Sequence, residues 1–355
     1  MPARPKSPDM TIVDIAAAAG VSVTTVSRII NDKPDVADET RERVMRLMEE
    51  TGFVPQSAWR QIRSGRSGLI ALHVPADFNP PSYRVIKAAA LGVEEAGYSV
   101  TIITSPLSDN ELLALFRSRK IDGIILLEVL VDDGRAALLR DHNLPFVMVG
   151  RRAESTEMSL VDIDIDHGIG IAVDHLVMLG HRMIGFLTID PVAQDKVYGF
   201  VTWALQAYER ACTRHGLPVL SRTDAPAIDA MTVAAQRLLT EHPEMTAVIA
   251  PQEQSAIGVV RAATALGRRI PEGLSVIAML SRSMAELATP PLTTLDFPAD
   301  EMGRTAARNL VDQLSQKQTD VQQVFLKPTL IARGSTAAPA PPEAAAAASP
   351  WSGTH

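Results

Sequence analysis

From Leu69 onward, short apolar runs alternate with longer amphipathic stretches, and this alternation constrains the fold more than any other feature of the sequence. Apolar runs of about four to eight residues, separated by segments of helix length, predict βαβ units and a parallel sheet. The apolar runs are LIALHV (69–74), SVTIIT (99–104), GIILLEVL (123–130) and PFVMVG (145–150). They predict a doubly wound α/β lobe.

The same pattern restarts after Asp166. The predicted elements are helices over 167–181, about 195–215 and 254–266, and strands over 183–189, 246–251 and 274–280. Two successive α/β units predict two similar lobes with a crevice between them, where ligands bind beyond the carboxyl ends of the strands. We expect a body over 68–334, with one lobe at about 68–165 plus 295–325 and the other at about 166–294.

Composition and charge permit several kinds of partner. The chain has 355 residues, of which 46% are hydrophobic and 21% charged, as in ordinary globular proteins. Its net charge is −7, but residues 1–66 hold 10 Lys and Arg against 9 Asp and Glu. We find no run of about 18 apolar residues and no signal-peptide pattern. A lone cysteine, Cys212, fits a reducing compartment. We therefore expect a cytoplasmic protein, associated with the nucleoid and not with a membrane.

The segment 11–55 has the spacing of a helix-turn-helix. Thr11 is a good N-cap for a helix IVDIAAAA, Gly20 supplies a tight turn, and Ser22 caps a second helix, VTTVSRII. A third helix over about 38–50 would pack across the first two. In this motif the second helix lies in the DNA major groove, so Val23, Thr24 and Arg28 are predicted to read bases.

The amino-acid sequence of this segment is more specific than its helix spacing. The runs TIVDIAAAAGVSVTTVSRIIN (11–31), VADETRERV (36–44) and TGFVP (51–55) resemble the headpiece of the LacI/GalR family of repressors. Similarity continues through RSGRSGLIALHVPADFNPP (63–81), RKIDGIIL (119–126), DHLVMLGHRMIGFL (174–187) and PPLTTLDFPADEMGR (290–304). The resemblance implies an all-α headpiece, a hinge helix at 56–67 and two periplasmic-binding-protein-like α/β lobes that dimerise. The flanks, 1–10 and the Ala/Pro-rich 335–355, are expected to be disordered.

The resemblance also implies which residues bind DNA. Phosphate contacts fall on Thr11, Ser22, Ser27 and Asn31, in addition to the three base readers, and Thr25 is included in the same surface. In the hinge, Arg60 matches the family, and Ile62 stands where relatives place a Leu that wedges into the minor groove. Trp59 replaces a family Ala, and either packing between hinge helices or contact with the body would explain it.

Several polar groups of sugar-responsive relatives are missing from the crevice. By local alignment Gly150 and Leu280 replace Asp, Ala204 replaces Arg, and an Asn-Asp pair survives only as Gln252 and Glu253. Each lost partner would leave a sugar hydroxyl unpaired, at about 1 to 3 kcal/mol. A simple sugar is therefore less favoured than in relatives, and a less polar ligand or no effector stays open. The predicted effector-binding positions are Tyr83, Gly150, Arg151, Ala204, Gln252 and Leu280, with Arg152 as a further polar candidate.

Other chemistry is not indicated. Asp162, Asp164 and Asp166 alternate as on one face of a strand, but they fall where the chain passes between lobes, so we expect no metal site and no cofactor. We find no phosphate-binding glycine loop and no nucleophile elbow, which disfavours an enzyme. The sequence predicts a repressor that binds a near-palindromic operator as a homodimer under small-molecule control. A ligand-independent DNA-binding regulator is the alternative, and a solute-binding protein is less favoured.

Overall fold

The computed structural model describes residues 10–30, 36–51, 53, 66–74, 82–193, 196–197, 199–316 and 320–341. Its internal contacts divide the chain into two compact units, Met1–Gly68 and Leu69–His355, which we call the headpiece and the body. Each unit has hydrophobic core of its own. The predicted hinge residues 56–65, with Arg60, Ile62 and Trp59, lie outside the described residues.

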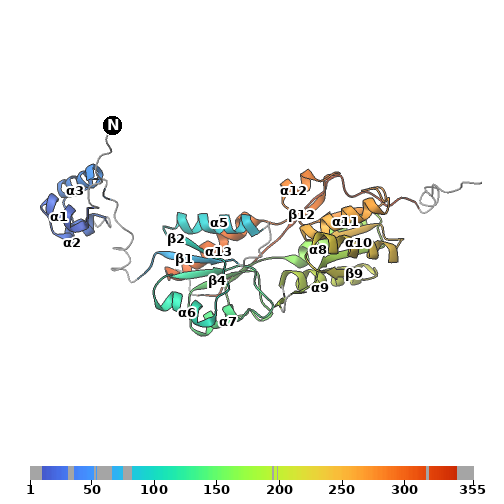
Figure 1. The fold of residues 1–355 in the computed structure, drawn as a ribbon, viewed down its shortest axis with the longest axis horizontal. Coiled ribbons are helices and arrows are strands. Elements are labelled where there is room, and N and C mark those ends of the chain that lie inside the picture. The colour runs from blue at the N-terminus through green and yellow to red at the C-terminus, as the bar shows by residue number, and fades with distance from the viewer. Residues whose placement is uncertain are drawn as a thin grey trace, which may run out of the picture. The chain divides into compact units, whose positions relative to one another are not determined.

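Three short helices form the headpiece: α1 (Ile12–Ala19), α2 (Val23–Ile30) and α3 (Asp38–Thr51) (Figure 1). Each helix contributes apolar residues, spaced three or four apart, to one shared core. The buried members are Ile12, Ile15, Ala16, Ala19, Val26, Ile29, Val44 and Met48. Because the apolar residues of α2 turn inward, its opposite face is left for other contacts.

The first lobe of the body is a parallel sheet in the order β13-β5-β4-β3-β1-β2. Its strands are β1 (Leu69–His73), β2 (Ser99–Ile103), β3 (Gly123–Leu126), β4 (Phe146–Val149), β5 (Leu160–Ile163) and β13 (Gln323–Leu326). Its helices are α5 (Ser82–Glu95), α6 (Asp109–Arg117), α7 (Gly134–Asp141) and α13 (Ala299–Leu314). One core cluster contains residues of α5 and α13 and another residues of α6 and α7, so the sheet is covered on both faces.

Helices α5 and α13 approach each other closely through glycine. A Cβ atom built on Gly303 of α13 would lie 2.3 Å from the carbonyl oxygen of Val85. A Cβ atom built on Gly92 of α5 would lie 2.9 Å from the Cβ of Ala307. These contacts join a helix of the N-terminal part of the body to one more than two hundred residues later, so the first lobe is made from two stretches of chain.

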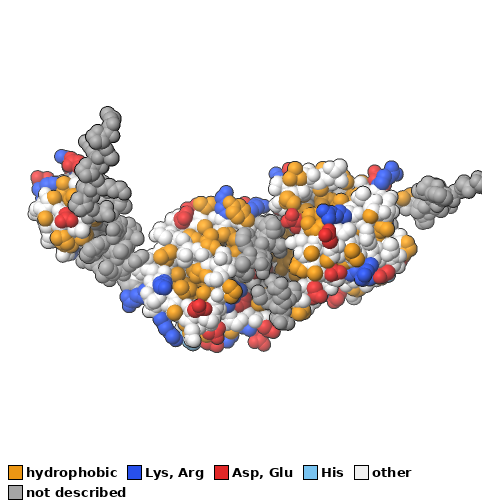
Figure 2. All heavy atoms as spheres, in the orientation of Figure 1, with side chains coloured by type: hydrophobic (Ala, Val, Ile, Leu, Met, Phe, Trp, Pro, Cys, Tyr) orange, Lys and Arg blue, Asp and Glu red, His pale blue; other side chains and the backbone are white. Residues whose placement is uncertain are grey.

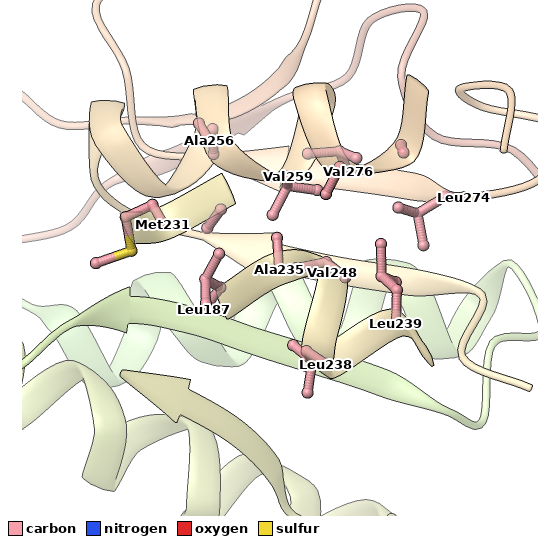
Figure 3. Packing of buried hydrophobic residues seen from close by; sticks show 14 of the residues in the cluster. Leu187, Met231, Ala235, Leu238, Leu239, Val248, Ala256, Val259, Leu274 and Val276 are labelled. Atoms are coloured by element: carbon pink, nitrogen blue, oxygen red, sulfur yellow. The ribbon is translucent and has the colours of Figure 1, made fainter. Parts of the chain in front are cut away.

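The second lobe has the strand order β14-β12-β11-β10-β6-β9. All neighbouring pairs are parallel except β12 with β14 at the edge. The strands are β6 (Ile184–Ile189), β9 (Leu220–Asp224), β10 (Ala247–Ala250), β11 (Ser275–Ala278), β12 (Thr293–Asp296) and β14 (Thr329–Ile331). The helices are α8 (Ile165–Met178), α9 (Gly199–His215), α10 (Ile228–Glu241), α11 (Glu253–Ala265) and the short α12 (Arg282–Leu287). Figure 3 shows side chains of α10 and α11 packing with those of the strands.

The chain passes between the lobes three times, from β5 to α8, from β12 to α13 and from β13 to β14. Each passage leaves the carboxyl end of a parallel strand, so these ends adjoin the connections. Phe200 and Phe297 pack against core clusters of both lobes. A hairpin of β7 (Val192–Ala193) and β8 (Lys196–Val197) adds a further contact, because the Val131 N–H donates to the Val197 carbonyl at 2.9 Å. The predicted α/β fold class with two sheets is confirmed.

The predicted start of a disordered tail at residue 335 is wrong. Ser335 is fully buried and bonded to two strands. Its carbonyl accepts from the Val276 N–H at 2.8 Å, and its hydroxyl donates to the Val276 carbonyl at 2.6 Å. The Thr293 N–H donates to the Ser335 hydroxyl oxygen at 2.7 Å. The Ala337 carbonyl lies 2.9 Å from Nε2 of His181. Residues 335–337 therefore complete the amino-terminal edge of the second sheet, and residues 342–355 lie outside the described part of the chain.

The three alternating aspartates fall where the chain enters the second lobe. Asp162 lies in β5, Asp164 is the N-cap of α8, and Asp166 lies within α8. The chain changes from strand to helix inside this run, so the three carboxylates do not share a strand face. Within the described residues, no group of three or more His, Cys, Asp or Glu side chains is placed to hold a metal ion.

Candidate nucleic-acid interface and effector site

The first turn of the headpiece is fixed by a capping box at Thr11. The Asp14 N–H donates to the Thr11 hydroxyl at 3.3 Å, and the Thr11 N–H donates back to the Asp14 carboxylate at 2.8 Å. Hydrogen bonds from the Thr11 hydroxyl and N–H hold the pKa of Asp14 below its ordinary value. At the other end of α1, Gly20 has φ = 65°, a left-handed conformation that glycine adopts without strain.

Ser22 fixes the start of α2. Its hydroxyl oxygen accepts from the Thr25 N–H at 3.0 Å and lies 2.9 Å from the Thr25 hydroxyl. This bond satisfies one of the N–H groups left over at a helix N-terminus. The two predicted phosphate-contacting residues Thr11 and Ser22 are thus helix-capping residues, and both side chains are exposed.

Helix α2 has one buried and one outward face. Val26 and Ile29 enter the headpiece core, and Val23 packs partly against it. Thr24 and Arg28 are exposed and lie four residues apart, so they share the outward face. Ser27 and Thr25 are partly exposed beside them, and Asn31 lies outside the described residues. The structure thus brings together two of the three predicted base readers and gives Val23 a share in the core.

At the carboxyl end of β4, Arg151 is engaged by the protein itself. Its Nη1 donates to the Asp162 carboxylate at 2.7 Å, and its guanidinium carbon lies 5.1 Å and 5.5 Å from the ring centres of Trp203 and Phe325. Burial raises the pKa of Asp162 to about 6, against the opposing charge of Arg151. Because Trp203 belongs to α9 of the second lobe, Arg151 links the lobes, a role that the predicted effector contact did not include.

Gly150, beside it, has φ = 103°, where a side chain would be strained. A Cβ atom there would lie 3.5 Å from Val129. The loss of the family aspartate at this position therefore accompanies a backbone conformation that favours glycine.

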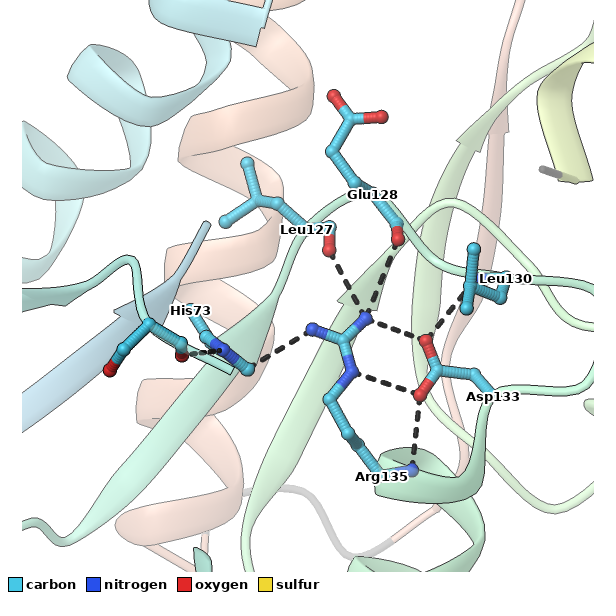
Figure 4. A network of polar contacts seen from close by, with 7 residues as sticks. His73, Leu127, Glu128, Leu130, Asp133 and Arg135 are labelled. Atoms are coloured by element: carbon cyan, nitrogen blue, oxygen red, sulfur yellow. Dashed lines mark hydrogen bonds and ion pairs between the residues drawn. The ribbon is translucent and has the colours of Figure 1, made fainter. Parts of the chain in front are cut away.

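A polar network that follows β3 was not predicted from the sequence (Figure 4). Arg135 donates to the Asp133 carboxylate through Nε at 2.9 Å and Nη2 at 2.6 Å, and its Nη1 lies 3.1 Å from Nδ1 of the buried His73. Nη2 also reaches the carbonyls of Leu127 and Glu128, at 3.3 and 3.4 Å. Burial and the charge of Arg135 lower the pKa of His73. The network fixes the backbone that follows β3.

That backbone connects to the start of α5. Glu128 has φ = 51°, and its carboxylate accepts from the Ser82 hydroxyl at 2.6 Å. The next residue, Tyr83, is 60% exposed, so this predicted effector residue is accessible. Ser82 and Glu128 were not among the predicted site residues. They lie 46 positions apart in the sequence, so their contact is seen only in the folded structure.

In the second lobe, Gln252 follows β10 and is 5% exposed. Its Oε1 accepts from the buried Thr188 hydroxyl at 2.8 Å. Leu280, two residues beyond β11, lies in the hydrophobic core of this lobe and is also nearly inaccessible. Gln252 is thus held in place at a strand end, whereas Leu280 contributes packing.

The predicted effector role of Ala204 is wrong for this structure. Ala204 has no exposed surface and packs in a core cluster with Phe186 and Tyr208. Helix α9 (Gly199–His215) contains Ala204, as the predicted helix at about 195–215 does, and the Ala204 side chain faces this core and not a ligand. Tyr208 is structural as well, because its hydroxyl donates to the Ile184 carbonyl at 2.7 Å and accepts from the Leu220 N–H at 3.1 Å.

A search of the described residues for a membrane-spanning helix finds no single helix that is long and apolar enough. The bent pair α1 and α2, with 100° between its halves, reaches the required length and composition together. Buried residues of both helices form the headpiece core, which accounts for their apolar composition.

Two family descriptions match the chain. Residues 11–56 match the bacterial regulatory proteins of the lacI family, and residues 173–336 match a periplasmic binding protein-like domain. The transcriptional regulator CelR of Thermobifida fusca is 31% identical over 92% of this chain and 98% of its own length. The repressor CytR of Escherichia coli strain K12 is 30% identical over 95% of this chain and 99% of its own length.

Two solved structures have a fold similar to that of this chain. A complex of CelR with cellobiose has a TM-score of 0.69 and 29% identity, covering 92% of this chain and 99% of that one. A lac repressor dimer bound to operator and the anti-inducer ONPF has a TM-score of 0.82 and 24% identity, covering 93% and 100%, which supports the fold. The chain belongs to the LacI family and is a DNA-binding transcriptional regulator, not an enzyme.

Proposed function

We propose that the protein is a cytoplasmic repressor that binds a near-palindromic operator as a homodimer and is controlled by a small molecule bound between the lobes of its body. The observation that supports this most is the outward face of α2, where Thr24 and Arg28 stand clear of the headpiece core. An arginine and a hydroxyl on the outward face of such a helix suit the edges of bases in the major groove.

The proposed protein partner of the body is a second copy of the same chain. Along α5, Tyr83, Lys87 and Leu91 are exposed at intervals of four residues, and Ile102 of the edge strand β2 is 54% exposed. Helix α5 contacts β2, and Figure 2 shows apolar side chains gathered on the first lobe in the region of these elements. Exposed apolar patches of this kind mark association surfaces, and a two-fold dimer would present one headpiece to each half-site.

The effector part of the proposal rests on the strand ends of the two lobes. Tyr83, Arg151 and Gln252 all lie there, and a relative with the same fold was solved with cellobiose. Arg60 and Ile62 of the hinge are proposed to contact the minor groove, with Asn31 at a phosphate. A ligand-independent regulator is the second candidate, because Arg151 is engaged by Asp162 and Leu280 is buried.

Selection of bound sequences from a random DNA pool tests the DNA-binding part. The native chain should enrich a palindrome of two short half-sites. Arg28→Ala should lose preference at one base position in each half-site, with affinity reduced about 10-fold or more, as expected for a bidentate arginine contact worth about 1–3 kcal/mol.

The matched control is Arg43→Ala, which removes the same charge from an exposed position on α3. It should weaken binding only slightly and equally for all sequences. An unchanged sequence preference in Arg28→Ala would contradict the proposed reading surface. Enrichment that no metabolite alters would favour the ligand-independent candidate.

A further inference from the structure

Among the described residues, three buried side-chain N–H groups near strand ends of the two lobes have no hydrogen-bond acceptor. They are Nε of Arg152, Nε1 of Trp203 and Nε2 of Gln252. Buried polar atoms without a hydrogen-bond partner are uncommon in native proteins. All three groups are donors, so the missing partner in each case is an acceptor.

Their positions relate them to the effector region. Arg152 lies just beyond the carboxyl end of β4, Trp203 in the second turn of α9, and Gln252 just beyond the carboxyl end of β10. The Arg151 carbonyl oxygen and Trp203 Nε1 lie 2.9 and 3.1 Å from one point, the Cβ position of a side chain at Gly199. These two atoms are therefore within about 6 Å of each other, so the Trp203 donor adjoins the peptide that joins Arg151 to Arg152.

Arg152 differs from the other two arginines of this region. Arg135 has the carboxylate of Asp133 and Arg151 has that of Asp162. Among the described residues, the Arg152 side chain forms no ion pair and no hydrogen bond. The carboxylates of Glu154 and Glu157, close in sequence, act on Arg140 instead and help to raise its pKa.

The backbone at Arg152 is fixed. Its N–H donates to the Ser155 hydroxyl oxygen at 3.2 Å, its carbonyl accepts from that hydroxyl at 3.0 Å, and the Ala153 N–H donates to the Val131 carbonyl at 2.9 Å. A positive charge on a fixed segment, with a buried donor and without a carboxylate, is suited to an anionic ligand.

We propose that the effector of this protein contains an oxyanion, carboxylate or phosphate, that pairs with Arg152, while Trp203 and Gln252 donate to other acceptors of the same molecule. This inference rests on the proposed effector control and adds the chemical class of the effector. The proposal is also compatible with the loss of the family aspartates at Gly150 and Leu280. A contact from Arg152 to the ligand would replace the hydrogen bonds that those carboxylates make in relatives.

Thermal unfolding of the full chain with matched neutral and anionic compounds tests the class. The probes are glucose, glucuronate and glucose 6-phosphate, with galactose and galacturonate, ribose and ribose 5-phosphate, and glycerol and glycerol 3-phosphate, at constant ionic strength. At least one anionic compound should raise the Tm of the body in a saturable manner, and its neutral counterpart should not. Binding of a uronate or of a phosphate ester identifies which oxyanion is used. A shift by neutral sugars alone, or by no anionic compound, would overturn the proposal.

Variants localise the effect. Arg152→Gln should raise the Kd of the active compound at least 10-fold with little change in the Tm without ligand, and Arg152→Lys should retain part of the affinity because it retains the charge. Arg140→Gln is the control, since the Arg140 side chain is partly exposed and pairs with Asp141. Equal loss in the control, or none in Arg152→Gln, would overturn the assignment. Selection from a DNA pool with the same preparations separates the two proposals: an enriched operator without any oxyanion effect removes only this inference, whereas no enrichment removes the proposed function.

Discussion

The headpiece and the body place their candidate functional side chains in opposite ways. In the headpiece, Thr24 and Arg28 lie outside a small apolar core to which they contribute nothing. In the body, Arg151 and Gln252 are bonded to buried partners, Asp162 and Thr188. A contact made by the headpiece therefore leaves its packing unchanged, whereas a ligand in the body binds beside contacts, such as that of Arg151 with Trp203, that also join the lobes. This difference suits a DNA reader and a switch, respectively.

The largest expected effect that separates the two units is removal of the Asp133 carboxylate. Asp133→Ala leaves the partly buried Arg135 guanidinium without its ion pair, and breaking a buried pair costs about 3–5 kcal/mol. Burial works to raise the pKa of Asp133, but Arg135 and two backbone N–H groups lower it further, so the native residue is ionised at neutral pH. Urea unfolding followed by far-UV circular dichroism should show the body destabilised.

The headpiece should be unaffected in this variant, because it belongs to a separate unit. Protection of its backbone amides against hydrogen exchange should equal that of the native chain. Loss of protection in α1 or α2 would mean that the two units do not unfold independently.

The converse substitution is Ile15→Ala in the headpiece core. Ile15 has no exposed surface, and such truncations cost about 3 kcal/mol. A core to which the described part of the headpiece contributes eight buried residues cannot absorb this loss, so specific DNA binding should disappear while the Tm of the body stays within about 1 °C. Exposed Val13 of the same helix supplies the control: Val13→Ala should retain a folded headpiece. DNA binding by Ile15→Ala at native affinity would contradict the assigned core.

These two units also differ in how far the sequence predicts them. Capping and turn formation depend on residues three or four apart, as in Thr11 with Asp14 and Ser22 with Thr25, and both are visible in the sequence. The alternation of apolar runs likewise predicts the two α/β sheets. By contrast, His73 and Arg135 are separated by 62 positions and meet only through the sheet.

Two errors have the same origin. Ala204 was assigned to the crevice by local alignment, but it packs in a core cluster with residues of α8 and β6 that are distant in sequence. Ser335 lies at the beginning of an Ala/Pro-rich stretch, and the composition of that stretch does not predict the hydrogen bonds of Ser335 to Val276 and Thr293. Contacts between distant segments override local composition in both places.

A further prediction concerns the pH dependence of the stability of the body, which Asp162 should influence. Its pKa is raised to about 6 from the ordinary 3.8, so the folded state binds a proton more readily than the unfolded chain does. The resulting stabilisation is complete below about pH 4 and is lost as pH rises through about 6, with a span of about 3 kcal/mol at about 1.4 kcal/mol per pKa unit.

The stability difference between the native chain and Asp162→Asn, measured by urea unfolding from pH 4 to pH 7.5, should therefore change in favour of the native chain as pH falls. The headpiece, which lacks this group, provides the internal reference through its own amide protection. A pH-independent difference, or one of opposite sign, would contradict the assigned burial of Asp162.

The central claim, that two copies of α2 read the two halves of one operator, is tested most directly by titration of the full chain with duplexes selected from a random pool. One duplex keeps both half-sites and the other has one half-site scrambled at equal length and salt. We expect two chains per intact duplex and at least a 100-fold loss of affinity on the scrambled one. Equal affinity for both duplexes, or one chain bound per intact site, would contradict it.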